Sequence, residues 1–129
     1  MSHDAFTQAY IVCALWSSND ESNDRGGDPL DSNYDATDIA PETLATMVAD
    51  CARFQAENAI DIDRAIAFPS VSYYDTSRAG HDFWLTRNGH GAGFWDRELG
   101  EVGARLSDAS KAFGSFDLYI GDDGKIRGA

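Results

Sequence analysis

The sequence predicts an α+β domain in which about three helices pack on a small antiparallel sheet built around a central β-hairpin. Apolar residues recur at three- and four-residue spacing in two N-terminal segments and in one C-terminal segment, which is the pattern of amphipathic helices. Between them, in residues 80–97, two β-prone aromatic runs flank an Asn-Gly step, which is a strong hairpin signal. With 129 residues, 43% of them hydrophobic and 12% aromatic, the chain is expected to fold as a single domain, residues 1–129.

The two N-terminal helices are predicted at residues 4–17 and 41–58. Ser2 or Asp4 could cap the first helix, and its apolar stripe is formed by Phe6, Tyr10, Cys13 and Trp16. Pro41 suits the first turn of the second helix, where Glu42 complements the helix dipole. The apolar face of this helix is expected to contain Leu44, Met47, Val48, Cys51 and Phe54.

The second half of the chain contains the predicted sheet. The central hairpin is expected at residues 82–95 with its turn at Asn88-Gly89, because a tight primed turn needs residues that tolerate a positive φ. A third helix follows at 96–113 and is ended by Gly114. Residues 116–120 alternate like a strand, and Asp123-Gly124 turns the chain back into 125–127. Residues 59–79 either extend the second helix or form a separate short turn before Pro69.

The net charge of −12 is unevenly distributed. Residues 1–80 carry 14 acidic and 4 basic side chains, a net −10, whereas residues 81–129 carry 8 acidic and 6 basic side chains, a net −2. Such a field repels nucleic acid and anionic membranes, and it attracts basic surfaces. We therefore expect no direct binding to nucleic acid or to a membrane, and the charge permits a basic protein partner.

The two cysteines, Cys13 and Cys51, lie in apolar helical patterns and not in clustered metal-ligand or CxxC spacing. The start of the chain has neither a basic region nor an apolar run, and no apolar stretch approaches the ~20 residues that span a bilayer. We therefore expect a cytoplasmic protein whose two thiols are reduced and at least half buried.

Known catalytic, cofactor and metal signatures fit the chain poorly. The glycine-rich run 89–93 precedes a predicted helix, but its spacing matches no phosphate loop, and Asp96 and Glu98 already place negative charge there. Residues 31–42 carry acids at several positions of a calcium loop, yet Ala36 stands where that loop needs glycine. His81 and His90 would lie ~20 Å apart in the predicted hairpin, too far for a shared metal. We therefore expect no metal, no cofactor and no tight calcium binding.

Four blocks of the chain carry a resemblance to a known group of proteins. They are residues 10–16 (Tyr-Ile-Val-Cys-Ala-Leu-Trp), 40–51, 80–97 (with Gly-His-Asp-Phe-Trp-Leu-Thr-Arg-Asn-Gly-His-Gly) and 118–124. In these blocks the chain resembles a group of small uncharacterised proteins of tailed bacteriophages. The resemblance implies an origin in a phage or prophage and action in the cytoplasm of the host cell. It implies no catalytic residues.

Two functions are compatible with these observations. The first, which we favour over an enzyme, is a binding protein that inhibits or modulates a host protein. It would occupy a basic surface, such as the nucleic-acid-binding groove of a defence or transcription complex. Its expected contact residues are Asp20, Glu21, Asp24, Asp28, Asp31, Asp35 and Asp38; the competing interpretation is that they only keep the protein soluble. The alternative function is a small enzyme or ligand-binding domain that uses His81, Asp82, Arg87, Asn88, His90, Asp96 and Arg97 of the predicted hairpin.

Overall fold

The computed structural model describes residues 3–20, 28–67, 74–89, 93–94 and 99–129, and these residues are mostly helical. The α-helices are α1 (Ala5–Ser17), α2 (Pro41–Glu57), α3 (Ala59–Ile66), α4 (Thr76–Arg87) and α5 (Gly100–Lys111). Two short 3-10 helices are η1 (Leu30–Ser32) and η2 (Ala36–Asp38). The strands form two antiparallel pairs: β1 (Asn19–Asp20) with β2 (Asp28–Pro29), and β3 (Leu118–Ile120) with β4 (Ile126–Gly128).

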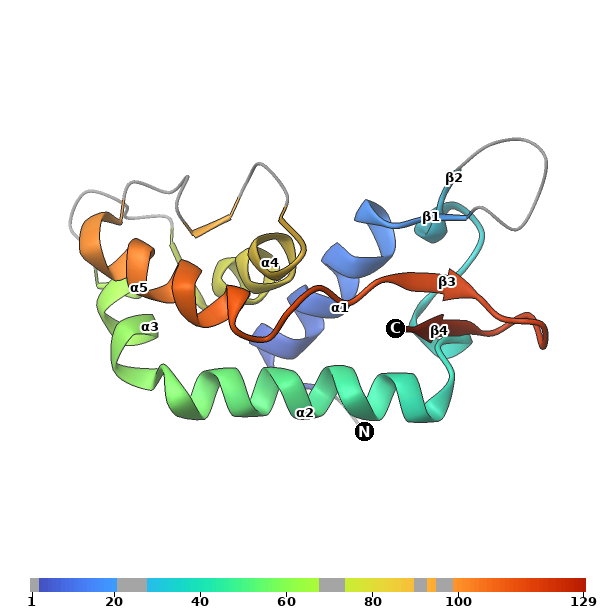
Figure 1. Cartoon of the computed structure of the whole chain (residues 1–129), viewed down its shortest axis with the longest axis horizontal. Helices are drawn as coiled ribbons and strands as arrows, with labels where there is room; N and C mark the ends of the chain where they lie inside the picture. The colour runs from blue at the N-terminus through green and yellow to red at the C-terminus, as the bar shows by residue number, and fades with distance from the viewer. Residues whose placement is uncertain (1–2, 21–27, 68–73, 90–92, 95–98) are drawn as a thin grey trace.

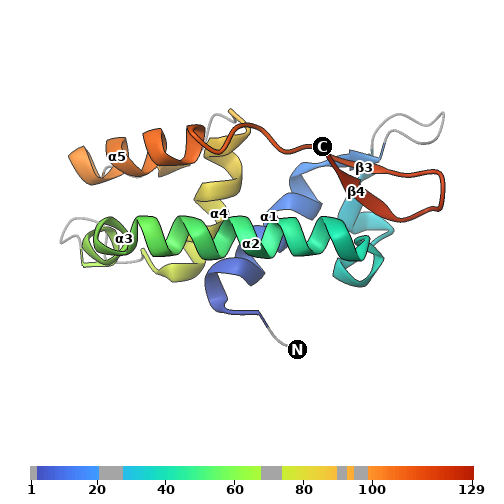
Figure 2. The ribbon, with the colours of Figure 1, turned by 60° about the horizontal axis from the view of Figure 1, so that its bottom comes forward.

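The helices and the strands occupy different parts of an elongated molecule. Helix α2 runs along one side, and α1 packs against it near the middle (Figure 1). Helix α4 packs mainly against α1 and reaches α2 through the ring of Phe83, which stacks on Phe54. Helices α3 and α5 lie together at one end, and both strand pairs lie at the opposite end, as the second view also shows (Figure 2). The strands therefore form an appendage to a helical body and not a platform on which the helices pack.

The first two helices form where the sequence predicts them. The Asp4 carboxylate caps α1 by accepting a hydrogen bond of 2.8 Å from the backbone N–H of Thr7. Pro41 opens α2, where its missing N–H costs nothing. The predicted apolar stripe of α1 needs one correction: Phe6, Tyr10 and Cys13 are fully buried, whereas Trp16 is 45% exposed.

The predicted central hairpin is wrong, and with it the predicted α+β class. Residues 82–87 belong to helix α4, which begins at Thr76 and ends at Arg87. The Asp75 carboxylate caps this helix by accepting a hydrogen bond of 2.8 Å from the N–H of Arg78. Gly89 has a φ of +73°, as the hairpin would also require, but here that conformation ends a helix.

The sequence does not predict α4, because this helix is buried on nearly all sides and its residues do not alternate between apolar and polar with the helical period. Almost every residue from Ala79 to Arg87 is buried, and the buried positions include Asp82, Thr86 and Arg87 as well as aromatic residues. A helix enclosed on all sides has no exposed polar stripe, so its sequence shows no alternation of apolar and polar faces. The aromatic run 83–85 then reads as a strand, because aromatic residues favour strands.

A cluster of aromatic rings from α1, α2 and α4 lies in the core, among aliphatic side chains. The rings of Phe54 and Phe83 stack with centroids 4.2 Å apart. The centroid of the Tyr10 ring lies 5.3 Å from that of Phe83 and 5.3 Å from that of Trp84. Helices α1 and α4 cross closely at Gly80, where an added Cβ would lie only 2.0 Å from the carbonyl oxygen of Phe6. The aromatic packing thus depends on one position that lacks a side chain.

The C-terminal half is partly as predicted. Helix α5 lies within the predicted range 96–113, and Gly114 follows its end with a φ of +76°. Strands β3 and β4 pair antiparallel as expected, with Ile120 opposite Ile126, and the turn between them contains Asp123-Gly124, with a φ of +78° at Gly124. Residues 59–66 neither extend the second helix nor form a short turn: they form a separate helix, α3, which begins just after Asn58 ends α2. Residues 76–79 belong to α4, and residues 68–73 lie outside the described residues.

Both cysteines are fully buried and no disulfide joins them, which confirms their predicted placement. Burial raises the pKa of the Cys51 thiol, so its reactive thiolate is scarce at neutral pH.

We expect a bulky maleimide to label both thiols far more slowly in the native protein than in urea, as measured by mass spectrometry over time. Rapid labelling of Cys13 or Cys51 in the native protein would contradict the packing of α1 and α2.

Candidate functional site: an acidic end of the molecule

The segment between α1 and α2 has a defined backbone structure in its described residues. Strands β1 and β2 pair, and the N–H of Leu30 donates to the carbonyl of Ser18 at 2.8 Å, while Leu30 itself is fully buried. In η2, the Asp35 carboxylate accepts from the N–H of Thr37 at 2.9 Å, and the Asp38 carboxylate accepts from the N–H of Asp35 at 2.8 Å. The acidic side chains around these turns are therefore presented from a fixed backbone.

The C-terminal hairpin docks directly on this acidic segment. Ile39 forms a parallel bridge with Ile126, and the N–H of Ala40 donates to the carbonyl of Ile126 at 2.8 Å. Arg127 then forms ion pairs with Glu42, at the start of α2, and with Asp123, at the hairpin turn. The contacts with Ile39, Ala40 and Glu42 join residues more than eighty positions apart in the chain. The β3–β4 hairpin, whose turn contains Asp122 and Asp123, therefore lies at the same end as the acidic segment (Figure 1).

We call this surface the acidic end. Its described carboxylates belong to Asp28, Asp31, Asp35, Asp38, Glu42, Asp122 and Asp123, and the basic side chains beside them are Lys125 and Arg127. Most of these side chains are exposed to solvent. At the opposite end, α3 and α5 carry a nearly balanced set, with Asp61 paired to Arg105 at 3.0 Å. Acidic side chains thus outnumber basic ones by seven to two at the acidic end, but only by four to three on α3 and α5.

Three carboxylates of the acidic end, those of Asp35, Glu42 and Asp123, are held in their ionised form by hydrogen bonds and by Arg127. The hydroxyl and N–H of Thr37 lower the pKa of Asp35. The Arg127 guanidinium and the N–H of Lys125 lower the pKa of Asp123. The pKa of Glu42 is lowered by its own backbone N–H and by Arg127. Their negative charge is therefore present at neutral pH and below it.

Four of the seven predicted contact residues lie on this surface: Asp28, Asp31, Asp35 and Asp38. Asp20 lies in β1, while Glu21 and Asp24 are outside the described residues. Asp122 and Asp123, which also lie on this surface, are not among the predicted contact residues. The strand alternation correctly predicted their hairpin, but nothing local indicates that this hairpin packs against residues 39–42.

The predicted calcium-loop mismatch has a structural counterpart. Within residues 31–42, Asp35 and Asp38 use their carboxylates to cap η2, and Glu42 pairs with Arg127. In the part of the chain that the structure describes, no three His, Cys, Asp or Glu side chains are grouped so that they could hold a metal ion. The absence of tight calcium binding stays a prediction.

Arg87, a residue of the alternative site, belongs to the packing of the core. Its side chain is only 4% exposed and donates hydrogen bonds to the Tyr10 hydroxyl and the Asp50 carboxylate, both at 2.9 Å. It also donates to the carbonyl of Gly114 at 2.8 Å and to that of Phe113 at 3.3 Å. Burial keeps the pKa of Tyr10 high, so its phenol stays protonated. One guanidinium thus joins α1, α2, α4 and the segment after α5.

His81 and Asp82 are in contact, although strand geometry predicts that they face opposite ways. The His81 Nδ1 atom lies 3.4 Å from the Asp82 carboxylate, which also accepts a hydrogen bond of 2.8 Å from the Tyr74 hydroxyl. Asp82 is fully buried, and the His81 ring stacks on Trp16 with centroids 5.8 Å apart. A hollow of about 220 Å³ beside His81 is below the ~300 Å³ at which small-molecule sites begin.

The remaining residues of the alternative site are not brought together in the described structure. The Asn88 side chain accepts a hydrogen bond from the N–H of Phe116 at 2.7 Å and donates to the Trp84 carbonyl at 3.0 Å, so it fixes the end of α4. His90, Asp96 and Arg97 lie outside the described residues. The structure therefore shows one His–Asp contact from this set and assigns Arg87 and Asn88 to packing.

No protein-family model, curated protein or solved structure matches the chain. Among the described helices, none has the length and apolar character needed to cross a membrane. The case for a function therefore depends on the surface chemistry described above.

Proposed function

We propose that the protein is a non-enzymatic binding protein whose acidic end occupies a basic surface on a protein partner. The observation that carries this proposal is the docking of the C-terminal hairpin on residues 39–42, which adds Asp122 and Asp123 to an acidic segment. Two distant acidic stretches thereby form one surface. The docking buries Ile126 and pairs Arg127 with Glu42 and Asp123, and it also brings these acids to one end of the molecule.

Electrostatics explains what such a surface does. Like charges on a rigid backbone create a potential that attracts basic surfaces over about 8 Å at physiological salt and farther at low salt. The expected partner is a host protein whose basic surface binds nucleic acid, for example in a defence or transcription complex. By occupying that surface, the protein would inhibit or modulate its partner inside the host cytoplasm, and the resemblance to tailed-phage proteins supports this setting.

The alternative function, a small enzyme or ligand-binding domain, has one observation in its favour. The contact between His81 and Asp82 could orient an imidazole for proton transfer. It is the weaker proposal because Asp82 is fully buried and Arg87 and Asn88 are engaged in packing.

The proposal is tested by removing charge from the acidic end alone. We expect the D28N/D31N/D122N variant to retain the fold but to capture a basic partner from bacterial lysate much less than the wild type does. Asn has nearly the same size as Asp, so these exposed changes remove charge without altering packing. The measurement is quantitative mass spectrometry of retained proteins at 0.05, 0.15 and 1 M salt, where screening shortens the field to ~3 Å at the highest salt.

A matched variant controls for net charge. D63N/E101Q/D108N removes the same number of charges from exposed positions on α3 and α5, at the opposite end. Its capture should equal that of the wild type, and a soluble polyanion such as heparin should displace the partner. If the acidic-end variant captured as much partner as the wild type, the acidic end would not be the binding surface. The same would follow if both variants lost capture to the same extent.

A further inference from the structure

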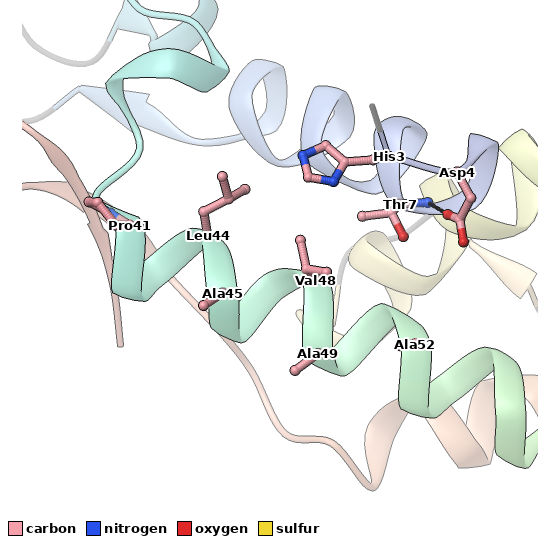
Figure 3. A pocket seen from close by; sticks show the side chains of 9 residues that line it. All are labelled: His3, Asp4, Thr7, Pro41, Leu44, Ala45, Val48, Ala49 and Ala52. Atoms are coloured by element: carbon pink, nitrogen blue, oxygen red, sulfur yellow. Dashed lines mark hydrogen bonds between the residues drawn. The ribbon is translucent and has the colours of Figure 1, made fainter. Parts of the chain in front are cut away.

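The molecule also carries an open apolar groove of about 680 Å³ between the start of α1 and the outer face of α2 (Figure 3). Leu44 and Val48 point toward His3, and three alanines lie on α2 beside them (Figure 3). The residues that line the groove are His3, Asp4, Thr7, Pro41, Leu44, Ala45, Val48, Ala49 and Ala52. This face of α2 is distinct from the buried face formed by Met47, Cys51 and Phe54.

The shape of the groove suits an α-helix. Its lining extends from Pro41 to Ala52 on α2, which at 1.5 Å per residue is about 16 Å, or three helical turns. Ala45, Ala49 and Ala52 recur at the four- and three-residue spacing of one helix face, and their small side chains allow a second helix to approach within about 8–10 Å. An amphipathic helix binds such grooves through side chains spaced at i, i+3, i+4 and i+7.

One carboxylate, that of Asp4, lines the groove, and a second, that of Glu42, follows Pro41 at the other end of the lining. At one end, Asp4 is exposed and accepts a hydrogen bond of 3.2 Å from Gln55; although its partial burial acts in the opposite direction, hydrogen bonds from Thr7 and Gln55 lower its pKa. At the other end, Glu42 follows Pro41 and shares Arg127 with Asp123, so two carboxylates face one guanidinium. Among the described residues that line the groove, there is no lysine or arginine. Both ends are therefore net negative.

The apolar lining and the two carboxylates together favour one class of binding segment. We infer that the groove binds a basic amphipathic helix of the protein partner, an inference that rests on the proposed function and extends it. Gln55, beside Asp4, is thirteen residues beyond Glu42 on α2, so the two carboxylates lie about 20 Å apart along the helix axis. The partner helix should carry basic side chains about thirteen residues apart, with apolar residues between them. A second copy of the chain is disfavoured, because each copy carries a net charge of −12.

The groove also adjoins the acidic end. Pro41 lines the groove, and the neighbouring Glu42 belongs to the acidic end through Arg127. A basic partner seated on the acidic end could therefore place a helix in the groove without leaving a gap between the two contacts.

The test uses a synthetic eighteen-residue helical peptide of leucine and lysine, with lysines at both ends and leucines at i, i+3, i+4 and i+7. A scrambled peptide of the same composition has the same charge but no apolar face. We expect the amphipathic peptide to bind at least tenfold more tightly by fluorescence anisotropy and to shift the NMR signals of residues 44–52. Equal affinity for both peptides would mean charge attraction only, and would overturn the inference.

Protein variants locate the site. A45Q/A49Q places longer neutral side chains at exposed groove positions, and A104Q/A112Q does the same at exposed positions on α5 and just after it. The groove variant should lose at least tenfold in affinity while the control keeps the wild-type value. D4N/E42Q should weaken binding and reduce its salt dependence, with the α1 cap retained because Asn also caps helices.

These outcomes are separable from those of the proposed function. If A45Q/A49Q binds the peptide as well as the wild type does, the groove inference fails even where the acidic-end variant loses its partner. If the acidic-end variant D28N/D31N/D122N keeps its lysate partner while the groove variant loses the peptide, the proposed function fails and the groove remains a helix site.

Discussion

Replacing Arg87 by Ala is expected to lower the free energy of unfolding by about 3–5 kcal/mol, the range found when one partner of a buried ion pair is removed. The change leaves the Asp50 carboxylate, the Tyr10 hydroxyl and two backbone carbonyls without their shared donor. It also opens a cavity beside Phe83, whose ring lies 5.5 Å from the guanidinium. Urea unfolding followed by far-UV circular dichroism measures the loss.

Two companion variants separate this network from a general effect of losing positive charge. Arg53 is 65% exposed and pairs with Glu57 within α2, so R53A should cost about 1 kcal/mol or less. R87K keeps the charge but lacks the planar fork that reaches four acceptors, and its stability should fall between that of R87A and the wild type. If R87A were no less stable than R53A, the hydrogen-bond network described here would be wrong.

Replacing Gly80 by Ala is the second change with a large expected effect. Its Cβ would lie 2.0 Å from the carbonyl oxygen and 2.8 Å from the carbonyl carbon of Phe6, and backbone atoms cannot rotate away as a side chain can. Helices α1 and α4 must then separate, so we expect a loss of about 3 kcal/mol or more despite the higher helix propensity of Ala. Thermal and urea unfolding of the purified variant measure it.

Gly114 supplies the control for this substitution. It has a φ of +76°, and a Cβ there meets no atom within 4 Å, so G114A should cost only the ~1–2 kcal/mol of a strained backbone. A G80A variant that is as stable as the wild type would show that α1 and α4 do not cross as closely as described.

The parts of the fold that the sequence predicts are those with a local signal. Helices α1 and α2 have an exposed side, and their starts carry Asp4 and Pro41, so periodicity and capping locate them within a residue or so. The β3–β4 turn is similarly local, since Asp123-Gly124 lies between two alternating segments.

The failure at residues 82–95 has two physical causes. Gly89 is needed for its positive φ both in a hairpin turn and after a helix, so the Asn-Gly step alone does not distinguish them. The surrounding residues, which include the fully buried Asp82 and the buried Arg87, remove the period that would have decided the question. Asp75, followed by Thr76 at the first helical position, was the local signal that could have corrected the prediction.

The candidate site was predictable only in part, for a different reason. The acidic segment is evident from composition, but the hairpin that completes the acidic end reaches it through contacts across most of the chain. The groove could have been found locally, because Ala45, Ala49 and Ala52 extend the apolar surface of α2 beyond its buried face. Whether this alanine face of α2 is covered by another part of the chain depends on the tertiary structure, and the helical spacing of apolar residues does not show it.

Hydrogen exchange in the captured complex tests the central claim most directly. Backbone amides of residues 30–39 and of the turn 121–125 should exchange more slowly when the wild-type protein is bound to its retained partner, because both segments form the acidic end. Amides of α3 and the exposed side of α5 should be unchanged and serve as the internal reference. Protection confined to α3 and α5, or to residues 76–89 around His81, would contradict the claim that the acidic end is the binding surface.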